Sequence, residues 1–537
     1  MTTIPVIWLG GHPVSWDQAM LDDALSGRMW PTGYEFRHCE TRQGEQWPEC
    51  DGAVVVVHGP MYAGRVALVN ELLDRLSWVL VCVTSDEERR FPLDQLRHPN
   101  MRVWLQYPQE DDNADGYLPV GYPPHLRALL PERPPERMYD WVFAGQVNHS
   151  RRKECVAAMH ALTGNVRIDV SPGFSQGLGH AEYAELLSSA RAVACPSGPH
   201  SVDSFRVWEA LEAGAVPVVD GKSPKGDGSW LWEKLSPGWV WFPVVDEWEN
   251  YVGASYAPTG GFGAYWLAWK QEWCKRIGQT IRQLSGVQPT PQPVTVLIPT
   301  SPIASHPDTS IIEQTIASVR HHHPDAEILV MCDGVRPEQE HYRERYSEYL
   351  DRLSWLAGRD GRVLPLIYDK HLHQVEMTRC ALDQVDSPMV LFVEHDTPLV
   401  TDEPIDWPAL QAAVLSGETD LVRFHYETWV HPEHEHLMLD REPRDVHGAP
   451  LLRTVQWSQR PHLANTGFYR RVLREEFPEG YVGMVEDKMH GVVHSAWRDY
   501  GLAGWDRYRL TMYAPRPNLK RSLHLDGRGD DPKWGEG

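Results

Sequence analysis

Short apolar runs alternate with amphipathic segments along the first part of the chain, and this pattern predicts strands and helices in turn. Strands are expected at Ile4–Gly10, Ala53–His58 and Trp78–Thr84, because short continuous apolar runs are typical of strands buried on both faces. Helices are expected at Ser15–Leu25 and Gly64–Leu76, where apolar residues recur at helical spacing. Strands that alternate with helices predict a parallel sheet covered on both faces.

The alternation resumes after a proline-rich linker at Leu130–Glu136. The expected elements are the strands Trp141–Gly145, Val166–Val170, Ala192–Cys195 and Val216–Val219, and the helices Ala181–Ala190, Asp203–Ala213 and Ala264–Leu284. Gly214 directly follows the second of these helices, at the position where glycine commonly ends a helix. This segment therefore predicts a second α/β half.

A segment with proline at every second position, within 286–293, is the clearest domain boundary in the sequence. Proline removes backbone donors and forces an extended chain. We therefore expect a first unit at 1–285, with halves at about 1–130 and 137–285, and a second unit at 294–537.

The second unit again opens with alternating elements. The expected strands are Val294–Thr300, Glu327–Gly334, Val363–Tyr368 and the run from Met389, and the expected helices are Ser310–His322, Pro337–Leu356 and Gln374–Asp386. Beyond Asp396 the alternation ends, and Asp420–Tyr426 and Gln456–Tyr469 predict strands and loops. The fold class that we predict is α/β, with two Rossmann-like halves followed by an α/β domain with a mixed sheet.

The run from Met389 ends in two acids, Glu394 and Asp396, followed by Pro398. Ligands of open α/β sheets bind at the carboxyl ends of the strands. Residues two apart on an extended chain project to the same side, so the two carboxylates could hold Mg²⁺ or Mn²⁺ together with a diphosphate. The alternative is a strand that ends in a solvated acidic turn.

The length and composition of the chain are typical of a water-soluble protein of several domains. The chain has 537 residues, 42% of them hydrophobic, and a formal net charge of −23, which argues against a large nonspecific phosphate-binding surface. The eight cysteines are scattered without a Cys-x-x-Cys pair, as is typical of reduced thiols in a cytoplasmic protein. We find no signal peptide and no apolar run long enough to cross a membrane.

The second unit resembles the GT-A fold of family-two-like inverting glycosyltransferases. The matching features occur in the family's order: the strand that ends at Thr300, the strand end at Asp333, a helix with Arg379, the Glu394-His395-Asp396 triplet in place of Asp-X-Asp, and the pair Glu486-Asp487. The sequence departs from the family in having glutamate as the first acid of the triplet. The resemblance covers about two-fifths of the chain.

This resemblance implies a nucleotide-sugar site, for a UDP- or GDP-sugar, at Thr300, Asp333 and Arg379. It implies that Asp396 binds Mn²⁺ or Mg²⁺, with Glu394 in support, and that the metal neutralises the departing nucleoside diphosphate.

Three further residues receive roles from the same resemblance. His524, in the basic tail, would complete the metal or phosphate contacts, and the alternative is an ordinary surface histidine. Asp487 would be the base that takes the proton of the acceptor hydroxyl, with Glu486 as the second candidate. The alternative for both acids is a helix N-terminus, where the dipole favours negative charge.

The first unit resembles the GT-B fold, and its second half resembles the donor-binding half of exostosin-like glycosyltransferases. The resemblance rests on Phe143-Ala144-Gly145 and on the run from Ser204 to Val219. It implies that Arg206 pairs with donor phosphate and Glu209 with the ribose hydroxyls, without an obligatory metal. The alternative is a salt bridge between these two residues on the surface of an ordinary helix.

Histidines also gather at His425, His431, His434 and His436. A zinc site is one interpretation, but the segment lacks His-Glu-x-x-His spacing and contains Pro432. We favour a loop that faces the acceptor.

The opening of the second unit, Pro299–Pro307, resembles glycosyltransferases encoded by bacteriophages, which implies the cytoplasm of the host. Hydroxymethylated bases of viral DNA and virion proteins or glycans are the acceptors this implies. The acidic balance counts against duplex DNA. A local basic cleft could include Arg441, Arg444, Arg453, Arg460, Arg470, Arg471 and Arg474.

Three interpretations follow. The first is a bifunctional glycosyltransferase with two active sites. The second is one catalytic unit joined to a unit that binds only carbohydrate or nucleotide. The third is a binding protein without activity, against which the acids and Arg206 argue.

Overall fold

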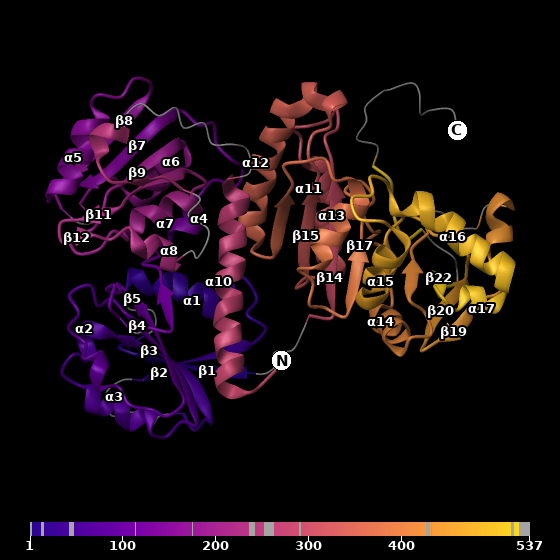
Figure 1. Ribbon diagram of the computed structural model, residues 1–537, viewed down its shortest axis with the longest axis horizontal. Helices are drawn as coiled ribbons and strands as arrows, with labels where there is room; N and C mark the ends of the chain where they lie inside the picture. Colours follow the sequence, from indigo (N-terminus) through magenta and orange to yellow (C-terminus); the bar gives the residue numbers. More distant parts are fainter. Residues whose placement is uncertain are drawn as a thin grey trace. The chain divides into compact units, whose positions relative to one another are not determined.

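A computed structural model describes residues 3–11, 15–41, 48–112, 114–173, 176–235, 242–251, 262–288, 292–425, 430, 432–516 and 520–525. The chain divides into two compact units, Met1–Thr290 and Pro291–Gly537 (Figure 1). The division falls inside the proline-rich segment 286–293, of which residues 289–291 lie outside the described ranges.

The first half of unit 1 is a parallel sheet whose described strands have the order β2-β1-β3-β4-β5-β6. The strands are β1 (Thr3–Leu9), β2 (Glu35–Thr41), β3 (Gly52–His58), β4 (Trp78–Thr84), β5 (Met101–Gln106) and β6 (Gly116–Leu118). The helices are η1 (Trp16–Gln18), α1 (Ala19–Leu25), α2 (Gly59–Tyr62), α3 (Val66–Leu73), η2 (Leu93–Gln95) and α4 (Leu126–Leu129). Every residue of β4 is buried, as its continuous apolar run predicts.

The second half of unit 1 is also a parallel sheet, with the described strands in the order β13-β10-β9-β7-β8. Its strands are β7 (Tyr139–Gln146), β8 (Val166–Ser171), β9 (Ala190–Cys195), β10 (Val216–Asp220) and β13 (Val244–Val245), and a small hairpin joins β11 (Lys222–Ser223) to β12 (Gly226–Asp227). Its helices are α5 (Ser150–Met159), α6 (His180–Ser188), α7 (Phe205–Glu212), α8 (Trp230–Leu235), α9 (Trp248–Tyr251) and α10 (Phe262–Ser285).

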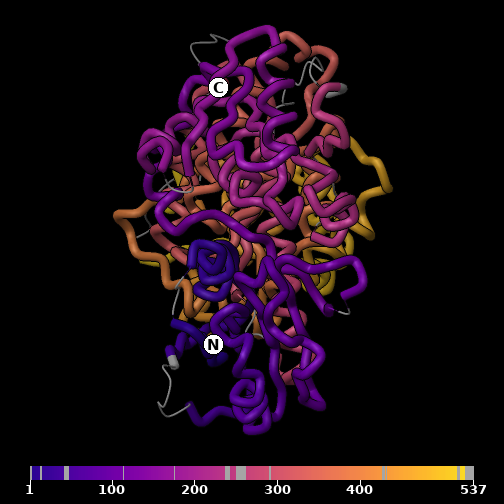
Figure 2. Tube along the Cα trace, turned by 90° about the vertical axis from the view of Figure 1, so that its left-hand side faces the viewer, coloured from indigo at the N-terminus to yellow at the C-terminus, as the bar shows by residue number. Residues whose placement is uncertain are grey.

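Helix α10 joins the two halves, because it packs against β4 and β5 of the first half and against α7 of the second. Figure 1 shows it running alongside both sheets, and Figure 2 shows the indigo first half and the magenta second half of this unit one above the other. The tryptophans Trp266, Trp269 and Trp273 of α10 are buried and their rings follow one another at 5.2 and 5.7 Å.

Unit 2 has a mixed sheet with the described strand order β16-β15-β14-β17-β21-β18-β22-β20-β19. The strands are β14 (Val294–Thr300), β15 (Glu327–Cys332), β16 (Val363–Ile367), β17 (Met389–Phe392), β18 (Leu421–Arg423), β19 (Arg444–Val446), β20 (Ala449–Arg453), β21 (His462–Asn465) and β22 (Leu510–Tyr513). The helices are α11 (Ser310–His322), η3 (Pro337–Tyr342), α12 (Arg343–Asp360), α13 (His373–Leu382), α14 (Trp407–Ser416), η4 (Pro432–Leu437), α15 (Thr466–Glu476), α16 (Val485–Tyr500) and α17 (Leu502–Trp505).

Four strands of unit 2 are parallel, from β16 to β17, and β21 then runs antiparallel to both β17 and β18. Strands β17 and β18 therefore point in the same direction, and their carboxyl ends lie at one edge of the sheet. The pairing Phe392↔His462↔Arg423 marks this edge.

The structure confirms the predicted α/β class, with two parallel Rossmann-like sheets followed by a mixed sheet. One segment was predicted wrongly: Thr466–Tyr469 begins helix α15, whose N-cap Asn465 accepts a hydrogen bond from Phe468 N, and does not continue the strand. None of the helices within the described ranges has the length and hydropathy needed to cross a bilayer.

Candidate functional site

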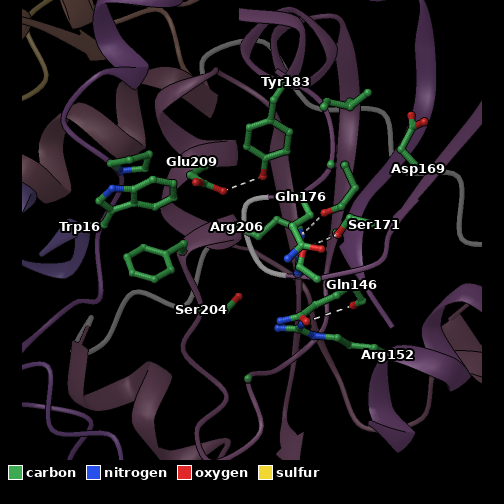
Figure 3. A pocket seen from close by; sticks show the side chains of 18 of the residues that line it. Trp16, Gln146, Arg152, Asp169, Ser171, Gln176, Tyr183, Ser204, Arg206 and Glu209 are labelled. Carbon is green, nitrogen blue, oxygen red and sulfur yellow. Dashed lines mark hydrogen bonds between the residues drawn. The ribbon is translucent and has the colours of Figure 1, made fainter. Parts of the chain in front are cut away.

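A cavity of about 720 Å³ lies in unit 1, with walls from both halves (Figure 3). Its volume is within the range usual for small-molecule sites. The second half contributes the carboxyl ends of β7 and β8 and the start of α7. Ligand sites of open parallel sheets are usual at such strand ends.

Arg206 lies on α7 and lines this cavity, as does Glu209. Arg206 is 8% exposed, and its Nε donates to Ala144 O at 2.9 Å. Its guanidinium carbon lies 5.0 Å from the centre of the Phe143 ring. Its buried Nη1 has no hydrogen-bond partner among the residues that the structure describes. A buried N–H of a guanidinium is costly to leave unsatisfied, so this one indicates a place for an anionic ligand.

Gly145 explains how the arginine reaches this position. Its φ is +145°, and a Cβ at this residue would collide with Nη2 of Arg206. Glycine alone combines that backbone conformation with the open space. The Phe143-Ala144-Gly145 motif thus forms the platform on which Arg206 rests.

Arg152, on α5, is a second buried cation that the sequence analysis did not single out. Its Nε donates to Ser197 O at 3.2 Å and its Nη1 to Gln146 O at 3.3 Å. Burial, and next to it the charge of Arg206, lowers its pKa to about 10. Two guanidinium groups this close repel each other, and a doubly charged anion between them would relieve that repulsion.

The N-terminus of α7 adds to this anion site. Ser204 occupies the N-cap position with an extended backbone, yet its side chain makes no capping bond. Its Oγ is buried without a partner in the described part of the chain. Free N–H groups and the helix dipole favour phosphate at such a terminus.

Glu209 is 6% exposed and accepts a hydrogen bond from the Tyr183 hydroxyl at 2.6 Å. Burial raises the pKa of Glu209, and the Tyr183 bond and the charge of Arg206 oppose that rise. The alternative of a surface salt bridge is wrong, because Arg206 and Glu209 are both buried and bond to Ala144 and Tyr183.

In unit 2, Glu394 and Asp396 lie in a turn and not on the extended strand that the sequence predicted. Strand β17 ends at Phe392, and Thr397 N donates to Glu394 O at 3.0 Å. The same-side argument from extended geometry is therefore wrong for Glu394 and Asp396. The negative charge of Glu394 contributes to the raised pKa of the buried Tyr469, after the larger effect of burial, so this acid lies near helix α15.

Asp396 meets the tail of the chain. His524 Nε2 lies 3.4 Å from Asp396 Oδ2. The tail runs antiparallel to residues 396–400, with Leu525 N donating to Asp396 O at 2.7 Å and Leu523 N to Pro398 O at 2.8 Å. The structure thus brings together two of the residues predicted to bind the metal.

Glu486 and Asp487 lie in the first turn of α16. Glu486 Oε2 accepts a hydrogen bond from Gln459 N at 2.9 Å. Gln459 lies three residues before β21, at the sheet edge where β17 and β18 end. Burial lowers the pKa of Arg423 at this edge to about 10, and the charge of Glu486 opposes the effect. Asp487 itself is exposed.

Three other predicted residues of unit 2 are engaged inside the protein. Thr300 Oγ1 lies 3.3 Å from Tyr349 OH, and both residues are buried. Asp333 accepts backbone hydrogen bonds from Leu372 at 2.7 Å and from His373, which hold the start of α13.

Arg379, the third, pairs with Glu376 and donates to the carbonyl oxygens of Leu473 and Phe477 at 2.9 and 3.2 Å. Its guanidinium therefore joins α13 to the end of α15. Thr300, Asp333 and Arg379 are thus all engaged in contacts within unit 2.

No group of three or more His, Cys, Asp or Glu side chains within the described ranges is placed to hold a metal ion. His434 and His436 lie in η4, and His431 lies outside the described residues. The Asp396–His524 pair still fits Mn²⁺, which binds oxygen and imidazole ligands and keeps positions for phosphate and water.

The comparisons with known proteins find no matching family model and no matching curated protein. Among solved structures, the chain is similar to S. aureus TarS 1-349, with 13% identity and a TM-score of 0.26 over 44% of this chain. It spans 60% of the length of that structure. It is also similar to the mannosyltransferase PcManGT from Pyrobaculum calidifontis in complex with GDP-Man and Mn²⁺, with 14% identity and a TM-score of 0.23 over 42% of this chain and 58% of the other.

A third similar structure is glucosyl-3-phosphoglycerate synthase from Mycobacterium tuberculosis, in complex with Mn²⁺, UDP-glucose and phosphoglyceric acid. Its identity is 16% and its TM-score 0.23, over 42% of this chain and 72% of the other. Likenesses of this size do not bear on the substrate, which has to be argued from the two sites themselves.

Proposed function

We propose that this protein is a glycosyltransferase that uses nucleotide-sugar donors and has one catalytic site in each unit. The observation that carries the proposal is the anion site of unit 1. There Arg206 and Arg152 lie beside the N-terminus of α7, and Arg206 Nη1 and Ser204 Oγ lack partners in the described residues. A nucleoside diphosphate supplies the charge and the acceptor oxygens that these groups require.

In unit 1, Arg206 and Arg152 would stabilise the diphosphate as it leaves, because preorganised cations favour the state in which negative charge develops. Glu209 would accept hydrogen bonds from the ribose hydroxyls, since its carboxylate lines the same cavity and is held by Tyr183. These contacts need no metal.

In unit 2, Asp396 and His524 would hold Mn²⁺ or Mg²⁺, with Glu394 in support. The metal, when bound, supplies positive charge to the departing nucleoside diphosphate. Asp487 would take the proton of the acceptor hydroxyl, because it is exposed on the first turn of α16 while Glu486 is held by Gln459.

Acceptors in the proposed function are a hydroxymethylated base of phage DNA, or a virion protein or its glycan, in the cytoplasm of the host. The arginines expected to build a basic cleft give DNA little support, because several are engaged. Arg453 is paired with Asp440 at 2.7 Å, and Arg470 donates to Leu382 O and Val385 O at 2.6 Å.

The alternative is that unit 1 alone is catalytic and unit 2 only binds carbohydrate or nucleotide. One observation favours it: Thr300, Asp333 and Arg379, expected at the nucleotide, are engaged in contacts inside the protein.

Substitution of Arg206 tests the donor site of unit 1. Arg206→Gln in the full chain should weaken the binding of UDP or GDP about ten- to hundredfold, the loss expected for a charge-assisted hydrogen bond. Isothermal titration calorimetry with EDTA present measures this site without the metal. Arg191→Gln, at an exposed arginine of β9, is the matched control. Equal affinity in Arg206→Gln and in the unchanged chain would show that the cavity is not a donor site.

A further inference from the structure

The cavity of unit 1 has a second wall that the proposed donor contacts do not use. We call it the aromatic wall, and it consists of Trp16, His125, His180 and Phe205. The centre of the Trp16 ring lies 5.5 Å from that of His125, 5.9 Å from that of His180 and 6.4 Å from that of Phe205. In Figure 3, Trp16 lies on one side of the cavity and Asp169 on the other, with Arg206 and Glu209 drawn between them.

The aromatic wall is built from both halves of the unit. Trp16 and His125 belong to the first half, at η1 and just before α4, whereas His180 opens α6 and Phe205 opens α7. The rings of His125 and His180 are 3.9 Å apart between centres. Phe205 follows Ser204 directly, so the aromatic wall begins where the anion site ends.

The charge of the first-half lining indicates what would bind there. The described lining residues from the first half are Trp16, Glu87, Tyr107, Val120, Pro123, His125 and Leu126. The one formally charged residue among them is Glu87, an acid. A nucleic-acid acceptor needs Lys or Arg to neutralise its phosphates, and this lining supplies neither. A neutral ligand ring with an apolar face would pack on the indole of Trp16 without needing such cations.

We infer that the aromatic wall is the acceptor subsite of unit 1, that it takes a hydroxyl of a neutral carbohydrate ring, and that His125 is the base. The inference rests on the donor site proposed above. The carbohydrate's apolar C–H face would lie on Trp16, and its hydroxyl would point to the imidazole of His125.

The reaction is then an inverting transfer. The acceptor oxygen forms a bond to the anomeric carbon of the donor while the bond from that carbon to the phosphate oxygen breaks. The electron pair of the broken bond leaves with the nucleoside diphosphate, beside Arg206 and Arg152. The hydroxyl proton passes to a ring nitrogen of His125. Burial, and after it the neighbouring His180, lowers the pKa of His125, which keeps its imidazole neutral and able to accept the proton.

The test uses the full chain with Asp396→Asn, which removes the proposed metal site of unit 2. Saturation-transfer NMR measures the binding of a mixture of the methyl glycosides of glucose, galactose, mannose and xylose, with UDP or GDP present. Trp16→Ala should weaken glycoside binding at least tenfold and Trp16→Phe less, while nucleotide affinity stays within twofold.

His125→Gln should leave nucleotide binding unchanged, weaken glycoside binding less than Trp16→Ala does, and lower the release of nucleoside diphosphate from UDP-glucose or GDP-mannose about a hundredfold or more. Imidazole should restore part of the rate in His125→Ala. His160→Ala, at an exposed histidine after α5, is the control.

Three results would overturn the inference. Either no glycoside binds, or Trp16→Ala binds glycosides as the unchanged chain does, or Trp16→Ala and His125→Gln both lose nucleotide affinity to the same extent. Transfer to a duplex oligonucleotide containing 5-hydroxymethylcytosine, without transfer to any glycoside, would overturn the carbohydrate class. Failure of the donor site is distinguishable, because nucleotide binding would then be absent before any substitution in the aromatic wall.

Discussion

Arg206 and Arg152 are buried in the same part of unit 1, and each is held by backbone carbonyl groups. The charge of Arg206 lowers the pKa of Arg152, and the negative charge of Glu87 opposes this effect only in part. Buried cations held in this way cost free energy in the empty protein. The cost is recovered when an anion binds, and this is why we assign them to a ligand and not to the stability of the fold.

Gly145→Ala tests how the backbone at Gly145 positions Arg206. A Cβ would force Arg206 from its platform, and φ at this residue is +145°. We expect nucleotide affinity to fall about tenfold or more and the free energy of unfolding to fall by about 1–3 kcal/mol. Calorimetric titration with UDP or GDP and urea denaturation measure the two effects.

Gly226→Ala is the matched control for this substitution. Gly226 has a φ of +131° but nothing within 4 Å of an added Cβ. It should therefore show a comparable backbone strain without any loss of nucleotide affinity. If Gly145→Ala keeps full affinity, the position of Arg206 on its platform does not matter for binding.

The part of the proposed site that the sequence indicated lies on one helix. Arg206 and Glu209 are three residues apart on α7, and such spacing is visible in a sequence. Ser204 precedes the same helix, whereas Arg152 on α5 and Tyr183 on α6 join the site only through the folding of separate helices. The arginine pair at the start of α5, shortly after Gly145, was the one available signal for Arg152.

At the scale of elements, a buried ion cluster fixes the two halves of unit 1 against α10. Glu212 of α7 accepts from Arg127 Nε of α4 at 2.6 Å and from Lys270 Nζ of α10 at 3.0 Å. Trp266 Nε1 donates to the same carboxylate at 2.8 Å. Burial by itself would raise the pKa of Glu212, but Lys270 and Arg127 outweigh it and lower the pKa to about 2.

Glu212→Gln should destabilise unit 1 by about 3–5 kcal/mol, because it leaves the buried Lys270 without its counter-charge and Arg127 with only the more distant Asp23, at 3.9 Å. Hydrogen exchange should rise first in α4, α7 and α10, as mass spectrometry of their peptides would show. Glu182→Gln, at an exposed acid of α6, is the control. Unchanged exchange in α10 would contradict the role of the cluster.

The same cluster sets a pH dependence. Since the pKa of Glu212 is about 2 in the folded chain and 4.5 in its ordinary state, its contribution is fully present above pH 4.5. It is lost as the pH falls from there towards 2. The protection of α10 against exchange should fall over this range in the unchanged chain and much less in Glu212→Gln.

Elements with a continuous apolar run or a clear helical spacing of apolar residues were predicted best. Strands β4 and β14 and helix α11 have the bounds that periodicity gave. Strand β2 was missed because its sequence, Glu-Phe-Arg-His-Cys-Glu-Thr, is mostly polar and it lies at the edge of the sheet. The turn at Glu394 was missed because the apolar run continues through Val393, one residue beyond the strand.

At the scale of the whole molecule, the two proposed sites differ in how they would neutralise a diphosphate. Unit 1 would use the buried guanidinium groups, whereas unit 2 would use a metal held by Asp396 and His524. The sequence pointed to this division through two different resemblances. Because only the proposed site of unit 2 would depend on a divalent cation, the number of nucleotides bound with and without the metal distinguishes the two sites.

Titration of the full chain with UDP or GDP should therefore reveal two sites in Mn²⁺ and one in EDTA. Asp396→Asn should leave one site in Mn²⁺, since His524 with only Glu394 in support would hold the metal too weakly. Arg206→Gln should leave only the site that EDTA removes. Asp487→Asn should keep both sites and lose transfer by unit 2, because a base acts on the acceptor and not on the donor. Asp499→Asn, at an exposed acid of α16, is the control. A single site that is the same in Mn²⁺ and in EDTA would support unit 1 as the one catalytic unit and would exclude a metal-dependent donor site in unit 2.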